Sequence, residues 1–133
     1  MFLTIECEYG MRVFRALSSG GQRPIKVIAA EENIPVVFAY KIIDKLIRAK
    51  FLQSEVGRAG GVRILRPLDE LSLYDIINVI DPSRCIFRCV QGENECKLNT
   101  AVRPCLIHKE LMRIQSVMEG ELKGKTIKDI LEL

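Results

Sequence analysis

Residues 51–67 read FLQSEVGRAGGVRILRP, and this stretch departs from the helical spacing that precedes it. Phe51-Leu52 and the run from Val62 to Leu65 are short and rich in aliphatic and aromatic residues, which is typical of β-strands. The segment GRAGG between them supplies the glycines that a hairpin turn needs, and it carries one arginine. The stretch therefore predicts a β-hairpin with a basic, glycine-rich tip.

Two short helices are predicted directly before the hairpin. Apolar residues at helical spacing predict the first at about 25–32, and Asn-Ile-Pro (33–35) ends it. Pro35 can open the second, because the first helical turn offers no partner for the N–H that proline lacks. The second helix would run to about Ala49. Two short helices followed by a hairpin describe a winged helix-turn-helix, whose second helix enters the major groove of DNA.

Helices are also predicted on both sides of this unit. Thr4 suits the N-cap of a first helix, with Phe14 and Leu17 on its buried face. Downstream, Ser72 and Asp75 have the spacing of a capping box, with aspartate in place of the usual glutamate or glutamine. A longer helix is expected from about residue 104, followed by a short last helix.

The longer helix carries an apolar stripe that one small domain would not bury by itself. We therefore expect the stripe to form a dimer interface, with packing into the chain's own core as the alternative. The predicted fold class is mainly α with a small β-hairpin wing, that is, a winged helix-turn-helix plus a long dimerisation helix. The stripe consists of Ile107, Leu111, Ile114 and Met118.

Composition places the chain among ordinary one-domain proteins of the cell interior. It has 133 residues, of which 48% are hydrophobic and 28% charged. It contains no apolar run of the roughly 18 residues that a membrane helix needs, and its first residues do not resemble a signal peptide. We expect a cytoplasmic protein without a membrane partner, whose cysteines stay reduced. The first half is the basic one, which favours a polyanion partner.

Residues 85–108 read CIFRCVQGENECKLNTAVRPCLIH and hold four of the five cysteines and the single histidine. The spacing lacks the paired knuckles of structural zinc sites and the close run of bacterial ferredoxins. Widely spaced thiols in a loop can wrap a polynuclear iron–sulfur cluster, and Cys105 and His108 would share one helix face. Incidental buried thiols, a zinc site and a cluster-free disulfide switch are the alternatives.

Several motifs together resemble the Rrf-type winged-helix regulators of bacteria, and the likeness runs nearly from end to end. By ligand pattern the chain is most similar to the iron–sulfur regulator IscR within that family. The motifs are LT….YGMRVFRAL (3–17), GRAGGVRIL (57–65), LSLYDIINVID (71–81), CLIH (105–108) and TIKDIL (126–131).

The resemblance implies that an iron–sulfur cluster is bound, with [2Fe–2S] favoured over [4Fe–4S]. The intervals between the cysteines are longer than is usual in the family, and a glutamate occupies the place where nitric-oxide sensors have a ligating aspartate. The fourth ligand therefore stays open. The implied ligands are Cys89, Cys96, Cys105 and His108, with Cys85, Cys7 and Glu8 as alternatives to the histidine.

A DNA contact surface follows from the same arrangement. Basic side chains would contact phosphates, apolar and aromatic side chains near the start of the second short helix would meet base edges or thymine methyls, and glycine amides of the wing would approach a phosphate. The predicted phosphate contacts are Lys41, Lys45, Arg48 and Arg58. The predicted base contacts are Val36, Val37 and Tyr40, and the glycines are Gly60 and Gly61.

These expectations combine into a homodimeric regulator of transcription, with repression favoured, that binds a palindromic operator and senses redox state, iron or nitric oxide. A cluster-free thiol/disulfide repressor of the same fold is the alternative. No enzyme motif or small-molecule substrate site is apparent. The expected division is residues 1–67 for the DNA-binding domain, 68–84 for a linker helix, 85–108 for the cluster-binding loop and 104–133 for the dimerisation and C-terminal helices.

Overall fold

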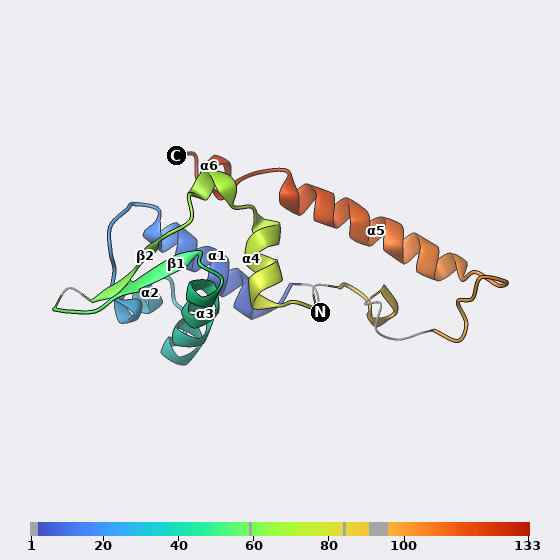
Figure 1. Ribbon diagram of the computed structural model, residues 1–133, viewed down its shortest axis with the longest axis horizontal. Helices are drawn as coiled ribbons and strands as arrows, with labels where there is room; N and C mark the ends of the chain where they lie inside the picture. Colours follow the sequence, from blue (N-terminus) through green and yellow to red (C-terminus); the bar gives the residue numbers. More distant parts are fainter. Residues whose placement is uncertain (1–2, 59, 84, 91–95) are drawn as a thin grey trace.

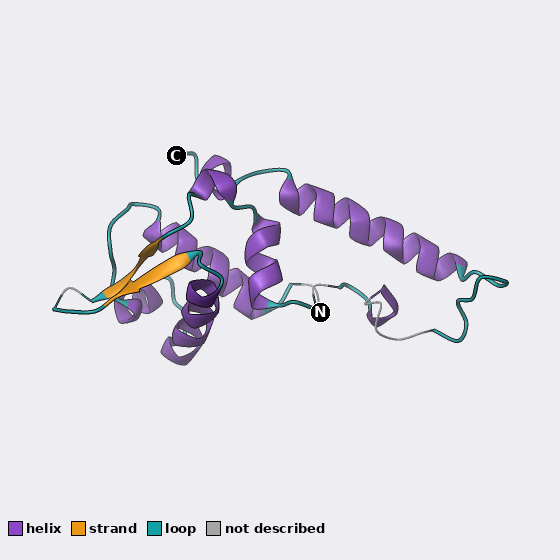
Figure 2. Ribbon diagram, in the orientation of Figure 1, coloured by secondary structure: helices purple, strands orange, loops and turns teal. Residues whose placement is uncertain are grey.

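The computed structural model describes residues 3–58, 60–83, 85–90 and 96–133. Figure 1 shows α1 to α4 and the hairpin gathered into one body, from which α5 extends. Figure 2 shows mainly helices beside an antiparallel hairpin, as the sequence predicts. The elements are α1 (Ile5–Leu17), α2 (Ile25–Glu31), α3 (Val36–Arg48), β1 (Leu52–Glu55), β2 (Gly61–Ile64), the 3₁₀ helix η1 (Leu68–Glu70), α4 (Leu73–Ile80), the 3₁₀ helix η2 (Arg88–Val90), α5 (Leu106–Lys123) and α6 (Ile127–Ile130).

Helix α1 begins where the sequence predicts, because the Thr4 hydroxyl accepts a hydrogen bond from the backbone N–H of Cys7. Phe14 and Leu17 are fully buried in the shared core. Gly10 is also buried, and a Cβ atom at this position would overlap the side chain of Ile80 at the end of α4. The glycine therefore allows α1 and α4 to pack closely.

Helix α3 is amphipathic, and its apolar face forms much of the core. Ala39, Ile42, Ile43 and Leu46 are fully buried. Val36 has the spacing of this face but is exposed, because it stands at the N-terminal end of the helix, beyond the core. The buried face fixes the helix against α1 and α2, so the exposed residues of its first turns point outward.

The hairpin pairs Leu52 with Ile64 and Glu55 with Gly61. The first strand begins at Leu52, one residue later than predicted, and polar residues continue it to Glu55. A backbone bridge joins the hairpin to the start of α2: the N–H groups of Arg23 and Val62 each donate to the other residue's carbonyl at 2.9 Å. The wing is therefore anchored to the helical body along its second strand.

Helices α4 and α6 each start with the predicted capping box. Ser72 and Asp75 exchange hydrogen bonds at the start of α4, and Thr126 and Asp129 do so at the start of α6. The N–H of Ile127 donates to the carbonyl of Leu71 at 2.7 Å, and the Ile127 side chain is buried in the core. The end of the chain thus returns to the helical body beside the start of α4.

Helix α5 is the one long element outside this body. It has 18 residues, of which Gln115 is buried and the others are half-buried or exposed. In the segment after α4, the 3₁₀ helix η2 lies beside α5 (Figure 1). Among the described residues, no helix has both the length and the apolar character needed to cross a membrane.

Candidate DNA-binding surface and cysteine segment

The first turns of α3 present apolar side chains to solvent. Val37 is 79% exposed and Tyr40 is 46% exposed, and Val36 beside them is also largely accessible. A helix whose opposite face is buried in the core holds such residues firmly in place. Apolar side chains at the start of a helix of this kind can contact thymine methyl groups in the major groove.

A shallow groove of about 260 Å³ joins this helix face to the wing. Tyr40 of α3, Lys26 of α2 and Ser54 of the hairpin line it together with Gly60 and Gly61. The structure therefore brings two predicted contact sites, the aromatic side chain and the wing glycines, to one surface. It adds a lysine that the sequence analysis did not select.

Gly61 has a structural role that the sequence analysis did not consider. Its φ of +154° is unfavourable for residues with a side chain, and a Cβ atom at this position would overlap the Arg23 carbonyl. The glycine is therefore needed where the wing meets the start of α2. A phosphate contact from its N–H stays a prediction.

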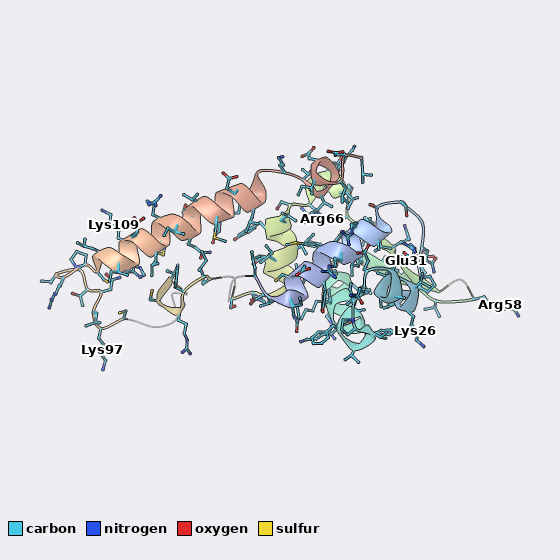
Figure 3. The ribbon with its side chains drawn as sticks, turned by 180° about the vertical axis from the view of Figure 1, so that it is seen from behind. Lys26, Glu31, Arg58, Arg66, Lys97 and Lys109 are labelled. Carbon is cyan, nitrogen blue, oxygen red and sulfur yellow. The ribbon has the colours of Figure 1, made fainter. Side chains whose placement is uncertain are left out.

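Lys26 and Arg58 lie on the same part of the surface as this groove. Figure 3 shows Lys26 projecting from α2 and Arg58 at the tip of the wing, both at the end of the molecule opposite Lys97 and Lys109. Arg58 was predicted to contact phosphate, and its exposed position at the tip is compatible with that role. Lys26 could have been recognised from the sequence, as a basic residue on the polar face of the predicted 25–32 helix.

Two of the predicted phosphate contacts are held by α1 and α4. Lys41 and Lys45 of α3 form ion pairs with Glu6, at 2.6 and 3.4 Å, and Lys45 also donates to the carbonyl of Ile80 at 2.8 Å. The hydrogen bond from Lys41 holds the pKa of the Glu6 carboxyl below its ordinary value. Lys45 thus links α3 to the last residue of α4, shortly before the cysteine segment.

Arg48, the last predicted phosphate contact on α3, pairs with Asp44 one turn earlier, at 2.9 Å. Both side chains are largely exposed. An exposed pair of this kind contributes little to stability, so it can exchange for a contact with DNA.

The five cysteines all lie within the described residues, and each is a free thiol. Cys7 is fully buried in α1, where it accepts a hydrogen bond from the Thr4 hydroxyl at 3.4 Å. The other four are half-buried and lie along the segment between α4 and α5. Glu8, the neighbour of Cys7, is exposed and forms an ion pair with Arg12.

Cys105 and His108 are brought together by the start of α5. Cys105 is the N-cap, and its Sγ accepts a hydrogen bond from the backbone N–H of His108 at 3.5 Å. The Nδ1 atom of His108 is buried and has no hydrogen-bond partner in the described part of the chain. An unpartnered buried nitrogen is unusual in a folded protein and is available to a ligand.

The other predicted ligands are not gathered around this pair. Among the described residues, no group of three or more cysteine, histidine, aspartate or glutamate side chains is arranged to hold a metal ion. Cys89 and Cys96 stand on either side of residues 91–95, which lie outside the described ranges.

Comparisons with known proteins identify the family. The Rrf2 family, described as "Iron-dependent Transcriptional regulator", matches residues 3–133. The chain belongs to the Rrf2 family. Protein aau3 of Rhizobium meliloti is 30% identical over 135 residues, covering 99% of this chain and 86% of that protein.

Solved structures of Rrf2 regulators have the same fold. The oxidized form of CymR from Staphylococcus aureus has a TM-score of 0.77 at 20% identity and covers 100% of this chain and 98% of its own. IscR from T. potens has a TM-score of 0.76 at 20% identity, covering 99% and 87%. The winged-helix fold predicted from the sequence is thus confirmed. Rrf2 proteins are regulators that bind DNA and typically dimerise, so this chain is a transcriptional regulator and not an enzyme.

The apolar stripe of α5 is exposed in this Rrf2 chain. Ile107 is 72% exposed and Ile114 is 36% exposed, whereas Leu111 and Met118 are half-buried. The alternative, that the stripe packs into the chain's own core, does not hold for Ile107. Further apolar residues widen the exposed face, namely Leu106, Met112 and Val117.

Proposed function

We propose that this Rrf2 regulator binds a palindromic operator as a homodimer and that the cysteine segment sets its affinity for DNA. The observation that supports the proposal is the arrangement of two surfaces at opposite ends of the molecule (Figure 3). The exposed start of α3 and the wing groove form one, and the thiol-rich segment beside α5 forms the other. Helices α4 and α5 connect them. Because the target is bacterial DNA, the protein would work in the cytoplasm.

Operator recognition divides between base contacts and backbone contacts. Val36, Val37 and Tyr40 would meet base edges and thymine methyl groups, because they occupy the exposed first turns of α3. Lys26 and Arg58 would contact phosphates on either side, which positions the protein without reading sequence. Gly60 and Gly61, which line the groove, leave room for the DNA backbone to approach the wing.

Homodimerisation would use the exposed face of α5. An 18-residue helix that leaves Ile107, Val117 and other large apolar residues in water is a poor final state for a single chain. A second copy with the same face would cover it symmetrically. A two-fold dimer presents two recognition helices to two half-sites about one DNA turn apart, which is why a palindromic operator is expected.

The donor set of the cysteine segment fits an iron–sulfur cluster in its chemistry. Thiolates and imidazole nitrogens are the ligands such clusters take, and the unpartnered Nδ1 of His108 is a buried donor beside the Cys105 thiol. We assign Cys89, Cys96, Cys105 and His108 as the ligands, with [2Fe–2S] favoured. Cys85 is the alternative to His108 that lies nearest in sequence to the other proposed ligands. Cys7 is buried in α1, and Glu8 would have to leave its ion pair with Arg12.

The bound group would supply sensitivity to redox state, iron or nitric oxide, and the chain's own residues would pass the change to DNA. The segment that carries the cysteines begins directly after Ile80, and the Ile80 carbonyl is held by Lys45 of the recognition helix. A rearrangement of residues 85–108 therefore acts on both α5 and the end of α4. The rearrangement changes the affinity for DNA only if the two conformations of the protein bind the operator with different affinities.

A cluster-free thiol switch is the second candidate function. The five free thiols and the likeness in fold to the oxidized form of CymR favour it. In this reaction two thiols, Cys85 with Cys89 or Cys96 with Cys105, would form a disulfide and give up two protons and two electrons. Hydrogen peroxide would accept them and be reduced to two molecules of water, or an organic hydroperoxide would be reduced to an alcohol and one water.

Protein purified without oxygen distinguishes the two functions. The cluster proposal expects a coloured protein with iron and acid-labile sulfide in equal amounts, about two of each per chain for a [2Fe–2S] cluster. Colourless protein without iron or sulfide, whose DNA binding responds to peroxide, would establish the thiol switch instead. Sedimentation of the same sample, with Ile107→Glu as the variant expected to be monomeric, tests the dimer.

A further inference from the structure

Asn99 connects three of the proposed ligand residues through hydrogen bonds. Its backbone N–H donates to the carbonyl of Cys96 at 2.8 Å. Its side-chain Oδ1 accepts a hydrogen bond from the backbone N–H of Cys105 at 2.9 Å. Cys105 in turn accepts from the N–H of His108. The chain of contacts thus runs from Cys96 through Asn99 to Cys105 and His108.

The Asn99 side chain supplies an acceptor that the backbone does not. Cys105 is the N-cap of α5, so its own N–H lies before the helix and has no carbonyl of α5 to bond to. The residue is half-buried. A donor in such a position costs free energy if it is left unpaired, and one amide oxygen from a neighbouring loop residue satisfies it.

A second pair of hydrogen bonds closes the tip of the same loop. The N–H of Thr100 donates to the Arg103 carbonyl at 3.2 Å, and the Thr100 hydroxyl accepts from the N–H of Arg103 at 3.0 Å. These contacts shape the tip but do not reach either cysteine. Figure 3 locates this loop at the free end of α5, near Lys97 and Lys109. Asn99 is therefore the residue that relates the two cysteines across the loop.

We propose that Asn99 is a positioning residue of the sensor site. By linking the backbone of Cys96 to that of Cys105, it limits how far the two residues can move apart before any ligand binds. Asn99 itself is not a ligand, because its side-chain oxygen is occupied by the Cys105 N–H. The inference rests on the proposed function only in naming an iron–sulfur cluster as the group that the thiols bind. The positioning of the two cysteines can be tested without iron.

The test uses the iron-free full-length chain with Cys85→Ser and Cys89→Ser, which leaves Cys96, Cys105 and the buried Cys7. Phenylarsine oxide reports two adjacent thiols, because each sulfur forms a bond to arsenic while the arsenic-bound oxygen leaves as water and the arsenic oxidation state does not change. Freeing even one backbone residue before binding costs about tenfold in affinity. We expect Asn99→Ala to weaken binding of phenylarsine oxide by about that factor.

Two further variants make the result specific. Asn99→Asp keeps an oxygen acceptor at the same place and is expected to retain affinity within about threefold of the parent. Thr100→Ala removes the hydroxyl at the loop tip and is expected to have little effect. Equal affinity in the parent and Asn99→Ala, or no joint binding by the two thiols in the parent, would overturn the proposal.

Hydrogen exchange of the Cys105 amide in chains that keep all five cysteines provides an independent measurement. The amide is expected to be protected in the parent and in Asn99→Asp, and to exchange faster in Asn99→Ala. An amide that exchanges equally fast in all three chains contradicts the positioning role. Counting iron in protein purified without oxygen separates this result from the proposed function. If the protein contains no iron but Asn99→Ala has the expected effect, the cluster proposal fails and the positioning role of Asn99 stands. If the protein contains iron but Asn99→Ala has no effect, the positioning role fails and the cluster proposal stands.

Discussion

Single residues at the wing carry two distinct kinds of role. Gly61 is required by the fold, because a side chain there would overlap the Arg23 carbonyl. Lys26 makes no comparable packing contribution and projects from α2 beside the groove (Figure 3). Substitution at the first should therefore change stability, and substitution at the second should change DNA binding.

Gly61→Ala is expected to lower the free energy of unfolding by about 1–3 kcal/mol, because the backbone must leave its positive φ or displace the start of α2. Gly120→Ala is the matched control. Its Cβ would meet nothing within 4 Å inside α5, so helix propensity alone predicts a gain of up to about 1 kcal/mol. Chemical denaturation of both variants measures the two changes, and equal effects of the same sign would refute the account of Gly61.

Lys26→Ala is expected to weaken binding to all DNA sequences alike. Loss of one phosphate contact lowers the slope of log affinity against log salt by about 0.9 per subunit, or about 2 for a dimer. Lys109→Ala, at the opposite end of the molecule, should leave the slope unchanged (Figure 3). Titrations at several salt concentrations measure the slope; an effect confined to one operator sequence would indicate that Lys26 reads bases instead.

At the level of elements, a few hydrogen bonds connect the proposed DNA-binding helix α3 and the cysteine segment to their neighbouring helices. The Lys45 side chain of α3 donates a hydrogen bond to the carbonyl of Ile80, the last residue of α4. Lys45 also forms an ion pair with Glu6 of α1. On the other side, the Gln115 side chain of α5 accepts a hydrogen bond from the N–H of Ile86 at 3.1 Å. Gln115 is only 4% exposed, so this contact fixes the start of the cysteine segment on α5.

The Glu6 tether makes stability depend on pH in one direction. The folded protein holds the pKa of Glu6 below its ordinary value of 4.5, chiefly through the hydrogen bond from Lys41. Its contribution is therefore present above about pH 4.5 and is lost as the pH falls through the depressed folded value. Glu6→Gln should flatten the decline of stability over that range.

Thermal unfolding from pH 6 downward checks this prediction. The parent chain should lose stability more steeply than Glu6→Gln below pH 4.5. The control is Glu70→Gln, because Glu70 has a long 3.7 Å ion pair with Arg66 and both side chains are exposed. If Glu6→Gln and Glu70→Gln have the same pH profile, the Glu6 tether does not contribute as described.

Gln115→Leu should release the start of the cysteine segment. The N–H of Ile86 loses its acceptor, and an unpaired half-buried donor costs about 1–3 kcal/mol locally. Cys85, the preceding residue, is then expected to react faster with an alkylating reagent. Mass spectrometry of pulse-labelled protein measures the rate, with the exposed neighbour change Ser116→Ala as the control. An unchanged Cys85 rate in Gln115→Leu would show that the contact does not hold the segment.

Much of this element order could be predicted from the sequence, because it depends on local signals. The capping boxes at Ser72 and Thr126 and the glycine-rich wing are readable within a few residues. The partner of Lys45 was not, because the Ile80 carbonyl lies 35 residues away in the sequence. Asn99 carried no signal either, since its role appears only when the loop folds back on Cys105.

The whole molecule joins a winged-helix body to an exposed helix and a thiol-rich segment. Figure 1 shows that α5 is joined to the body through α6, beside the start of α4, and that the segment begins at the other end of α4. A change at the far end of α5 can therefore reach the body along both paths. Membership of the Rrf2 family establishes a transcriptional regulator; that the cysteine segment controls its affinity for DNA is the central claim.

The most direct test is the dissociation constant for an operator fragment, measured at fixed salt in two states of the protein. The first state is the protein as purified without oxygen. The second is the same protein after the group bound by the cysteines has been removed or the thiols have been oxidised. The account predicts a difference of about 5- to 150-fold, the usual range of coupling between two sites. It also predicts that the difference disappears when Cys89, Cys96 and Cys105 are replaced together by serine. Equal dissociation constants in both states of the parent chain would contradict it.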